Sequence, residues 1–144
     1  MTITFFGHRD TPSRVKKPLR KIIKMLIEDY GADLFYVGNQ GEFDNAARII
    51  LKDLKKEYKF SYGVVLAYSP FKSREYDESL ADAIFPEELE NASAKSAIPR
   101  RNEWLINNSD MVITYVHKSE GGAYRSKILA EKKGKIIINI PELK

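Results

Sequence analysis

The stretch TITFFGHR, residues 2–9, decides the fold of this chain. It opens with a run of apolar and β-branched residues that is too short for a helix and stops at Gly7, so 2–6 is expected to be a strand. After this strand, over residues 13–30, apolar residues recur at helical spacing, with lysine and arginine at the other positions. That pattern predicts an amphipathic helix, capped by Ser13 at its start and ended by Gly31 in the left-handed conformation.

The same alternation of short apolar runs and amphipathic segments continues along the chain. A strand is expected at 34–37, a helix at 43–54 and a third strand at 60–68. Strands that are almost wholly apolar and alternate with helices are typical of a parallel sheet covered on both faces.

The second half completes this pattern after a long excursion. Residues 100–108 are expected to be a short helix, 111–116 a fourth strand, 121–134 a helix and 136–140 a fifth strand. The sequence therefore predicts an α/β fold, a single-domain Rossmann-like three-layer sandwich over residues 1–144, with about five parallel strands, helices on both faces and an insertion or lid at about 71–98.

Composition excludes several classes of site. The chain has 144 residues, 24 Lys+Arg against 20 Asp+Glu, a net charge of +4, two histidines and no cysteine. Disulfides, thiol nucleophiles, cysteine-ligated zinc and multi-histidine metal centres are excluded, and neither a metal nor a cofactor is expected. No apolar run approaches the roughly 20 residues of a membrane span, and the first residues do not form a signal peptide, so a cytoplasmic protein without membrane contact is expected.

Polar and glycine-rich loops follow the predicted strands. In an open parallel sheet, ligands bind beyond the carboxyl ends of the strands, so these loops are expected to form one polar cleft. Two glycine turns, at 38–41 and 121–122, each open a helix. Helix N-termini carry free amides and partial positive charge, so both turns are expected to bind phosphate, helped by Arg9 and Arg101.

Three features of the sequence have more than one interpretation. His8 is either a ligand contact or a structural hydrogen-bonding residue that shapes its loop. Asp44 either binds a ribose hydroxyl or caps its helix, and the cap is favoured. The basic run 16–24 is interpreted as a solvated helix face rather than a nucleic-acid patch. The dinucleotide motif G-x-G-x-x-G and the P-loop motif are both absent, which argues against NAD dehydrogenases and P-loop NTPases.

Three motifs together resemble a known family. The residues FGHR at 6–9, GNQGEFD at 38–44 and GGA at 121–123 are similar to motifs of the SLOG superfamily, and in particular of its bacterial and phage GHR branch. This Rossmann-like superfamily includes LOG-type cytokinin-activating phosphoribohydrolases and the nucleotide-binding domain of DNA-processing protein A. The resemblance covers most of the chain outside about 71–98.

The resemblance also suggests what this chain lacks. Arg101 and Asp110 keep the spacing of the LOG enzymes, but Lys127 or Ile128 stands where those enzymes have their catalytic glutamate. A basic or apolar side chain cannot replace a carboxylate that stabilises positive charge on a ribosyl ring. LOG-type catalysis is therefore not expected, although the phosphate-binding turns are retained.

The resemblance implies that the chain binds a nucleotide or a nucleotide-derived signalling ligand as a sensor or sequestering protein, and that it forms a homo-oligomer. Phe43 or Tyr124 is expected to stack on the base. The expected ligand contacts are Gly7, His8, Arg9, Gly38, Asn39, Gly41, Phe43, Asp44, Ser69, Arg101, Asn102, Gly121, Gly122, Ala123 and Tyr124.

Two other functions stay open. The first is a phosphoribohydrolase or a deoxyribosyltransferase-like enzyme, for which Glu42, Glu120 and Arg101 are the catalytic candidates. The second, single-stranded DNA binding, is disfavoured because the net charge is small for a nucleic-acid partner.

Overall fold

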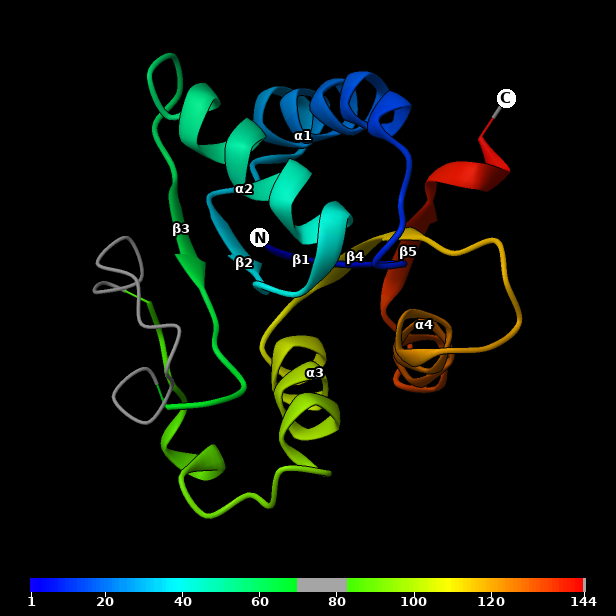
Figure 1. The fold of residues 1–144 in the computed structure, drawn as a ribbon. Coiled ribbons are helices and arrows are strands. Elements are labelled where there is room, and N and C mark those ends of the chain that lie inside the picture. Colours follow the sequence, from blue (N-terminus) through cyan, green and yellow to red (C-terminus); the bar gives the residue numbers. More distant parts are fainter. Residues whose placement is uncertain (70–82, 144) are drawn as a thin grey trace.

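The structure, a computed structural model, describes residues 1–69 and 83–143. Its centre is a sheet of five parallel strands in the order β3-β2-β1-β4-β5 (Figure 1). The strands are β1 (Thr2–Gly7), β2 (Leu34–Val37), β3 (Ser61–Val64), β4 (Met111–Tyr115) and β5 (Ile136–Asn139). The predicted parallel α/β sheet is therefore confirmed.

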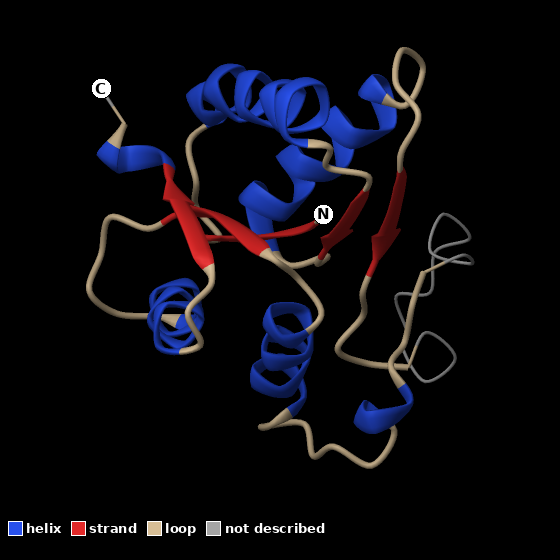
Figure 2. Ribbon diagram, turned by 180° about the vertical axis from the view of Figure 1, so that it is seen from behind, coloured by secondary structure: helices blue, strands red, loops and turns tan. Residues whose placement is uncertain are grey.

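Helices cover both faces of this sheet, as predicted. On one face lie α1 (Lys16–Tyr30) and α2 (Gly41–Leu54), and on the other lie α3 (Ala97–Asn107) and α4 (Gly122–Lys132) (Figures 1 and 2). Among the described residues, the short 3-10 helices η1 (Ser13–Val15), η3 (Glu87–Leu89) and η4 (Ile140–Glu142) connect or end these elements.

The sheet separates two apolar cores, and β1 contributes to both. Ile3 and Phe5 pack with α1 and α2, whereas Phe6 packs with α3 and α4. Successive strand residues point to opposite faces, so a strand buried on both faces must be apolar at nearly every position. This is why the strands read as continuous apolar runs in the sequence.

The third strand is shorter than predicted. β3 ends at Val64, and Val65 forms only an isolated bridge with Ile84. Its neighbour β2 ends at Val37, so the chain beyond Val65 has no longer strand to pair with. The run 65–67 is nevertheless buried, which explains why its apolar sequence was mistaken for strand.

Helix boundaries also differ in part from prediction. Ser13 does not cap α1, because it begins η1 and α1 starts at Lys16 without a side-chain cap. Helix α3 starts at Ala97 rather than at residue 100. Gly31 does end α1 in the left-handed conformation, with φ 71°. Much of the proposed insertion at 71–98 lies outside the described residues, so a lid there stays a prediction. No helix within 1–69 and 83–143 is both long and apolar enough to cross a membrane.

Candidate functional site

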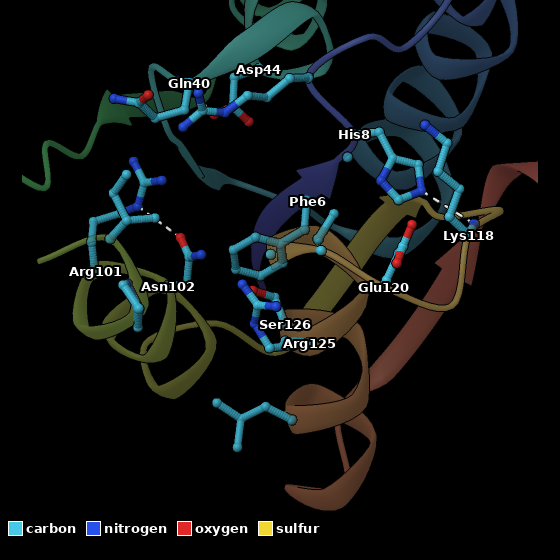
Figure 3. Close-up of a pocket in the computed structure, with 18 of the residues that line it drawn as sticks. Phe6, His8, Gln40, Asp44, Arg101, Asn102, Lys118, Glu120, Arg125 and Ser126 are labelled. Carbon is cyan, nitrogen blue, oxygen red and sulfur yellow. Dashed lines mark hydrogen bonds between the residues drawn. The ribbon is translucent and has the colours of Figure 1, made fainter. Parts of the chain in front are cut away.

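A pocket of about 1000 Å³ opens at the carboxyl ends of β1 and β4 (Figure 3). From β1 the sheet runs to β2 on one side and to β4 on the other, so this is the point at which the strand order reverses and where open α/β sheets bind ligands. Its walls come from the loop after β1, the start of α2, the first half of α3, and the β4–α4 loop with α4.

Most of the predicted contact residues lie in this pocket. Those that line it are Gly7, His8, Arg9, Asp44, Arg101, Asn102, Gly121, Gly122 and Ala123, and the catalytic candidate Glu120 lines it as well. The contact residues that do not line it are Gly38, Asn39, Gly41, Phe43 and Tyr124, and the catalytic candidate Glu42 also lies outside it. Ser69 lines a smaller pocket of about 290 Å³ beside η3.

The start of α4 is the part of the pocket that best suits an anion. Gly121 precedes the helix with φ 94°, and no side chain caps the helix or places an acid in its first turn. The carbonyl of Gly121 accepts from the Arg125 amide at 3.0 Å, so the amides between them lie in the first turn, where no intrahelical acceptor exists. A Cβ added at Gly122 would meet only the Arg125 Nη2 atom, at 4.0 Å. Backbone donors and a guanidinium therefore lie together at an open edge.

The other glycine turn serves the protein itself. The Gln40 amide donates to Asp44 Oδ2 and the Glu42 amide to the Arg9 carbonyl, each at 2.9 Å. A Cβ at Gly41 would lie 2.7 Å from the backbone of Arg9. This turn is closed against the β1–α1 loop, so its geometry does not favour the expectation that it binds phosphate as the other glycine turn does.

Behind this turn lies a buried pair of opposite charges. Asp44 and Arg101 are 6% and 3% exposed, and both approach Gly38: a Cβ there would lie 2.6 Å from Asp44 Oδ2 and 2.7 Å from Arg101 Nη1. Arg101 also donates to the Val65 carbonyl at 3.1 Å and to Asn102 Oδ1 at 2.9 Å. Gly38 is needed here because any side chain would displace one of the two charges.

Burial shifts the pKa values of both groups. It raises the pKa of Asp44 to about 6, against the opposing attraction of Arg101, and it lowers the pKa of Arg101, against the attraction of Asp44. Asp44 accepts from the amide of Gln40, the residue that precedes α2, as the helix-cap interpretation expects, while a ribose contact of Asp44 stays a prediction.

Two other predicted contacts have structural roles. Phe43 is fully buried between Phe5 and Tyr115, so the expectation that it stacks on a base is wrong. His8 is 8% exposed, and its Nε2 atom accepts from the backbone amides of His117 and Lys118. The hydrogen-bonding interpretation of His8 is the one that this geometry supports.

Several cationic residues of the pocket were missed from the sequence. Lys95, Lys118 and Arg125 all line it. Lys118 pairs with Asp10 at 3.2 Å, whereas Arg125 and Lys95 form no ion pair within the part of the chain that the structure describes. The position of Arg125, one turn after the glycine pair, was a signal that could have identified it.

Comparison with known proteins supports the fold. No protein-family model matches the chain, and no curated protein matches its sequence. Among solved structures, DNA processing protein A (DprA) from Streptococcus pneumoniae is similar, with a TM-score of 0.75 and 16% sequence identity over 94% of this chain and 48% of that one. The chain thus spans about half the length of that protein. At this identity the similarity shows a shared Rossmann-like α/β fold.

Proposed function

We propose that this chain binds a nucleotide or a nucleotide-derived signalling ligand in the pocket at the β1–β4 edge, as a sensor or sequestering protein of the SLOG superfamily and its GHR branch. The observation that carries the proposal is the uncapped start of α4, which opens into the pocket beside Arg125. Free amides at a helix N-terminus bind phosphate, and a guanidinium adds charge-assisted hydrogen bonds.

The remaining walls suit the rest of such a ligand. Figure 3 shows Arg101 and Asn102 on one side of the pocket and His8, Lys118 and Glu120 on the other, with Arg125 and Ser126 between them. Polar groups on opposite walls can fix the orientation of a ligand with several hydrogen-bonding groups. A volume of about 1000 Å³ accommodates a nucleotide with its base, sugar and phosphates.

The region around α4 supports binding without LOG-type catalysis. Lys127, one of the two residues at the position of the missing glutamate, pairs with Glu131 at 2.8 Å, and neither Lys127 nor Ile128 lines the pocket. No carboxylate replaces the glutamate at this point of the helix.

We expect calorimetry with a panel of mono-, di- and cyclic nucleotides to detect binding that depends on Arg125. The Arg125→Ala variant should bind at least tenfold more weakly, because a hydrogen bond to a charged group contributes about 1.5–3 kcal/mol. The Lys132→Ala variant removes a cation from the same helix but outside the pocket and should bind like the wild type. Absence of binding by every nucleotide to the folded protein would refute the proposal.

An enzymatic function is favoured by one observation, the presence of Glu120 on the pocket wall. The other carboxylate candidate, Glu42, is exposed and lies outside the pocket. We expect incubation with nucleoside monophosphates to release no free base. Release that disappears in Glu120→Ala but persists in Glu42→Ala would establish a phosphoribohydrolase or deoxyribosyltransferase-like enzyme instead.

Single-stranded DNA binding is the third candidate, and the fold shared with a protein named for DNA processing makes it worth testing. Oligonucleotide affinity that falls steeply with salt would favour it. A homo-oligomer and a cytoplasmic location stay predictions that light scattering and cell fractionation can check.

A further inference from the structure

The loop between β4 and α4 forms one wall of the pocket and leads into the start of α4. Its residues Lys118, Glu120 and Gly121 all line the pocket. The loop is fixed at its beginning by Asn139, whose side chain accepts from the Val116 amide and donates to the Val116 carbonyl, each at 2.9 Å. Asn139 therefore anchors the end of β4 but reaches no further along the loop.

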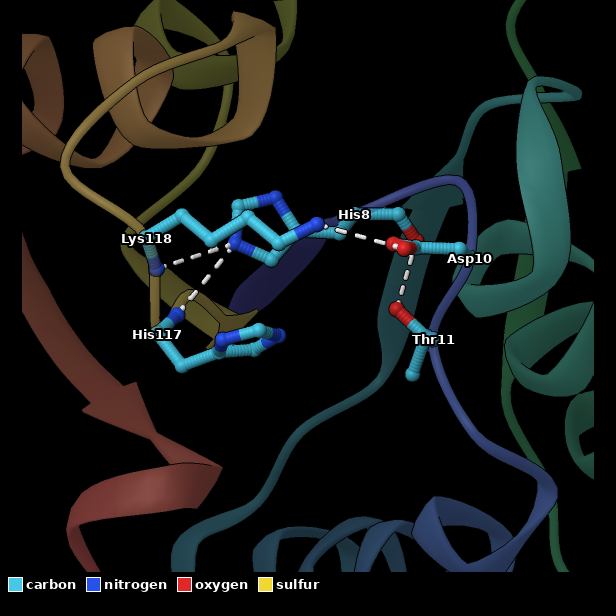
Figure 4. Close-up of polar contacts among 5 residues, drawn as sticks. All are labelled: His8, Asp10, Thr11, His117 and Lys118. Atoms are coloured by element: carbon cyan, nitrogen blue, oxygen red, sulfur yellow. Dashed lines mark hydrogen bonds and ion pairs between the residues drawn. The ribbon is translucent and has the colours of Figure 1, made fainter.

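The next two residues of the loop are held by His8. Its Nε2 atom accepts from the amide of His117 at 3.2 Å and from that of Lys118 at 3.4 Å (Figure 4). The backbone of His8 is itself fixed, because its amide donates to the Tyr115 carbonyl at 3.3 Å and its carbonyl accepts from the Thr11 amide at 3.2 Å. One side chain thus ties the end of β1 to the wall of the pocket.

These contacts require an uncharged ring. An imidazole nitrogen accepts a hydrogen bond only when it carries no proton, so His8 must be neutral with its proton on Nδ1. A charged ring would direct an Nε2 proton at two amide protons. The three titratable groups that face His8 are His117, whose ring lies edge-on at 4.9 Å, Lys118, and Asp10, which pairs with Lys118 at 3.2 Å.

We propose that His8 is a positioning residue, which holds the β4–α4 loop, and with it the anion-binding start of α4, only while its imidazole is neutral. The anchoring of the loop follows from the contacts alone. Its effect on a ligand rests on the proposed function.

The direction of the resulting pH dependence follows from the surroundings of the ring. Burial first, and then the positive charges of His117 and Lys118, lower the pKa of His8 from 6.5, while Asp10 opposes them. The imidazole of His8 therefore binds a proton more tightly in the unfolded chain than in the folded one. The stabilisation that neutral His8 gives to the fold is complete above about pH 6.5 and is lost as the pH falls through the pKa of His8 in the folded protein. The loop is therefore held at neutral pH and released in acid.

Two measurements on the unliganded protein test this anchoring. Long-range ¹H–¹⁵N spectra of the wild type should show His8 with its proton on Nδ1, and a proton on Nε2 would overturn the proposal. Amide exchange should show that the protection factors of the His117 and Lys118 amides fall about tenfold as the ring is protonated, which is the loss of roughly one hydrogen bond.

Substitutions separate the charge of His8 from its role as an acceptor. In His8→Gln the amide oxygen can accept from the same two amides without titrating, so protection should persist in acid. In His8→Ala it should be low at every pH. His117→Gln, which removes the neighbouring titratable ring, should keep the wild-type profile with its midpoint moved slightly upwards. Equal profiles in the wild type and His8→Gln, or unchanged protection in His8→Ala, would overturn the proposal.

Sulfate is the probe for the effect on the anion site, because it does not titrate in this range. Shifts of the Gly122 and Ala123 amides should show sulfate affinity falling several-fold in acid for the wild type and not for His8→Gln. Failure of the nucleotide panel with these exchange and tautomer results intact would refute the proposed function alone. Nucleotide binding by the folded protein, together with exchange and tautomer results that contradict the anchoring, would refute the role of His8 alone.

Discussion

Arg101→Met is expected to lower the free energy of unfolding by about 3 kcal/mol at neutral pH, the cost of leaving a buried charged group and a buried carbonyl without their partner. The substitution leaves Asp44 buried without its compensating charge and the Val65 carbonyl without its donor. At about 2–4 °C per kcal/mol for a chain of this size, the melting temperature should fall by roughly 10 °C.

The same variant should show a characteristic pH dependence. Arg101 opposes the upward shift of the Asp44 pKa, so without it that pKa rises further above about 6. A carboxyl group with a raised pKa loses stability as the pH rises through that value, because the folded state then holds the proton more tightly than the unfolded state does. The deficit of Arg101→Met should therefore be largest in alkaline buffer and much smaller at about pH 5, where Asp44 is neutral.

Arg100→Met is the matched control. Arg100 precedes Arg101 in the same helix but is exposed, so its replacement should change the free energy of unfolding by no more than about 0.5 kcal/mol. Thermal unfolding of the three proteins at several pH values makes the comparison. Equal stability of Arg101→Met and Arg100→Met would show that Arg101 and Asp44 are not coupled as the structure indicates.

Most of the fold could be predicted because burial on both faces leaves a strong signal in the sequence. The runs at β1, β2 and β4, the inner strands of the sheet, are apolar for this reason, and glycine or a polar loop ends each of them. The edge strand β5 is apolar although its Ile136 is exposed. The same signal failed at 65–67, since those residues are buried without being paired in a longer strand. The apolar composition of a segment indicates that it is buried, but it does not show which other segment of the chain covers it.

The site was predicted in part for a similar reason. Chain order placed His8 and Gly121 at one edge of the sheet, because the carboxyl ends of parallel strands meet there. Glycine, however, has two uses that look alike in a sequence: at Gly121, where φ is 94°, it allows a backbone conformation that other residues rarely adopt, and at Gly38 it makes room for Asp44 and Arg101. Distinguishing them requires the side chains that approach from distant parts of the chain.

Gly7→Ala is the second substitution for which we expect a large effect, a loss of about 3 kcal/mol at the upper end of the usual cost of overpacking. A Cβ at Gly7 would lie 2.2 Å from Phe43 Cγ and 2.5 Å from Phe43 Cβ. The ring is fully buried between Phe5 and Tyr115, so α2 or β1 must move to admit the methyl group. Since Asp44 follows Phe43 in α2, that movement should also disturb the buried pair beside the pocket.

Gly122→Ala is the control for Gly7→Ala, because a Cβ at Gly122 would meet no atom closer than 4.0 Å. Alanine is favoured over glycine in a helix by roughly 0.5–1 kcal/mol, so Gly122→Ala should be at least as stable as the wild type in thermal unfolding. If the steric contact with Phe43 causes the loss, the double variant Gly7→Ala with Phe43→Ala should be less destabilised than the sum of its single variants. Strict additivity would mean that the end of β1 tolerates the methyl group without moving α2, and that the pocket does not depend on this contact.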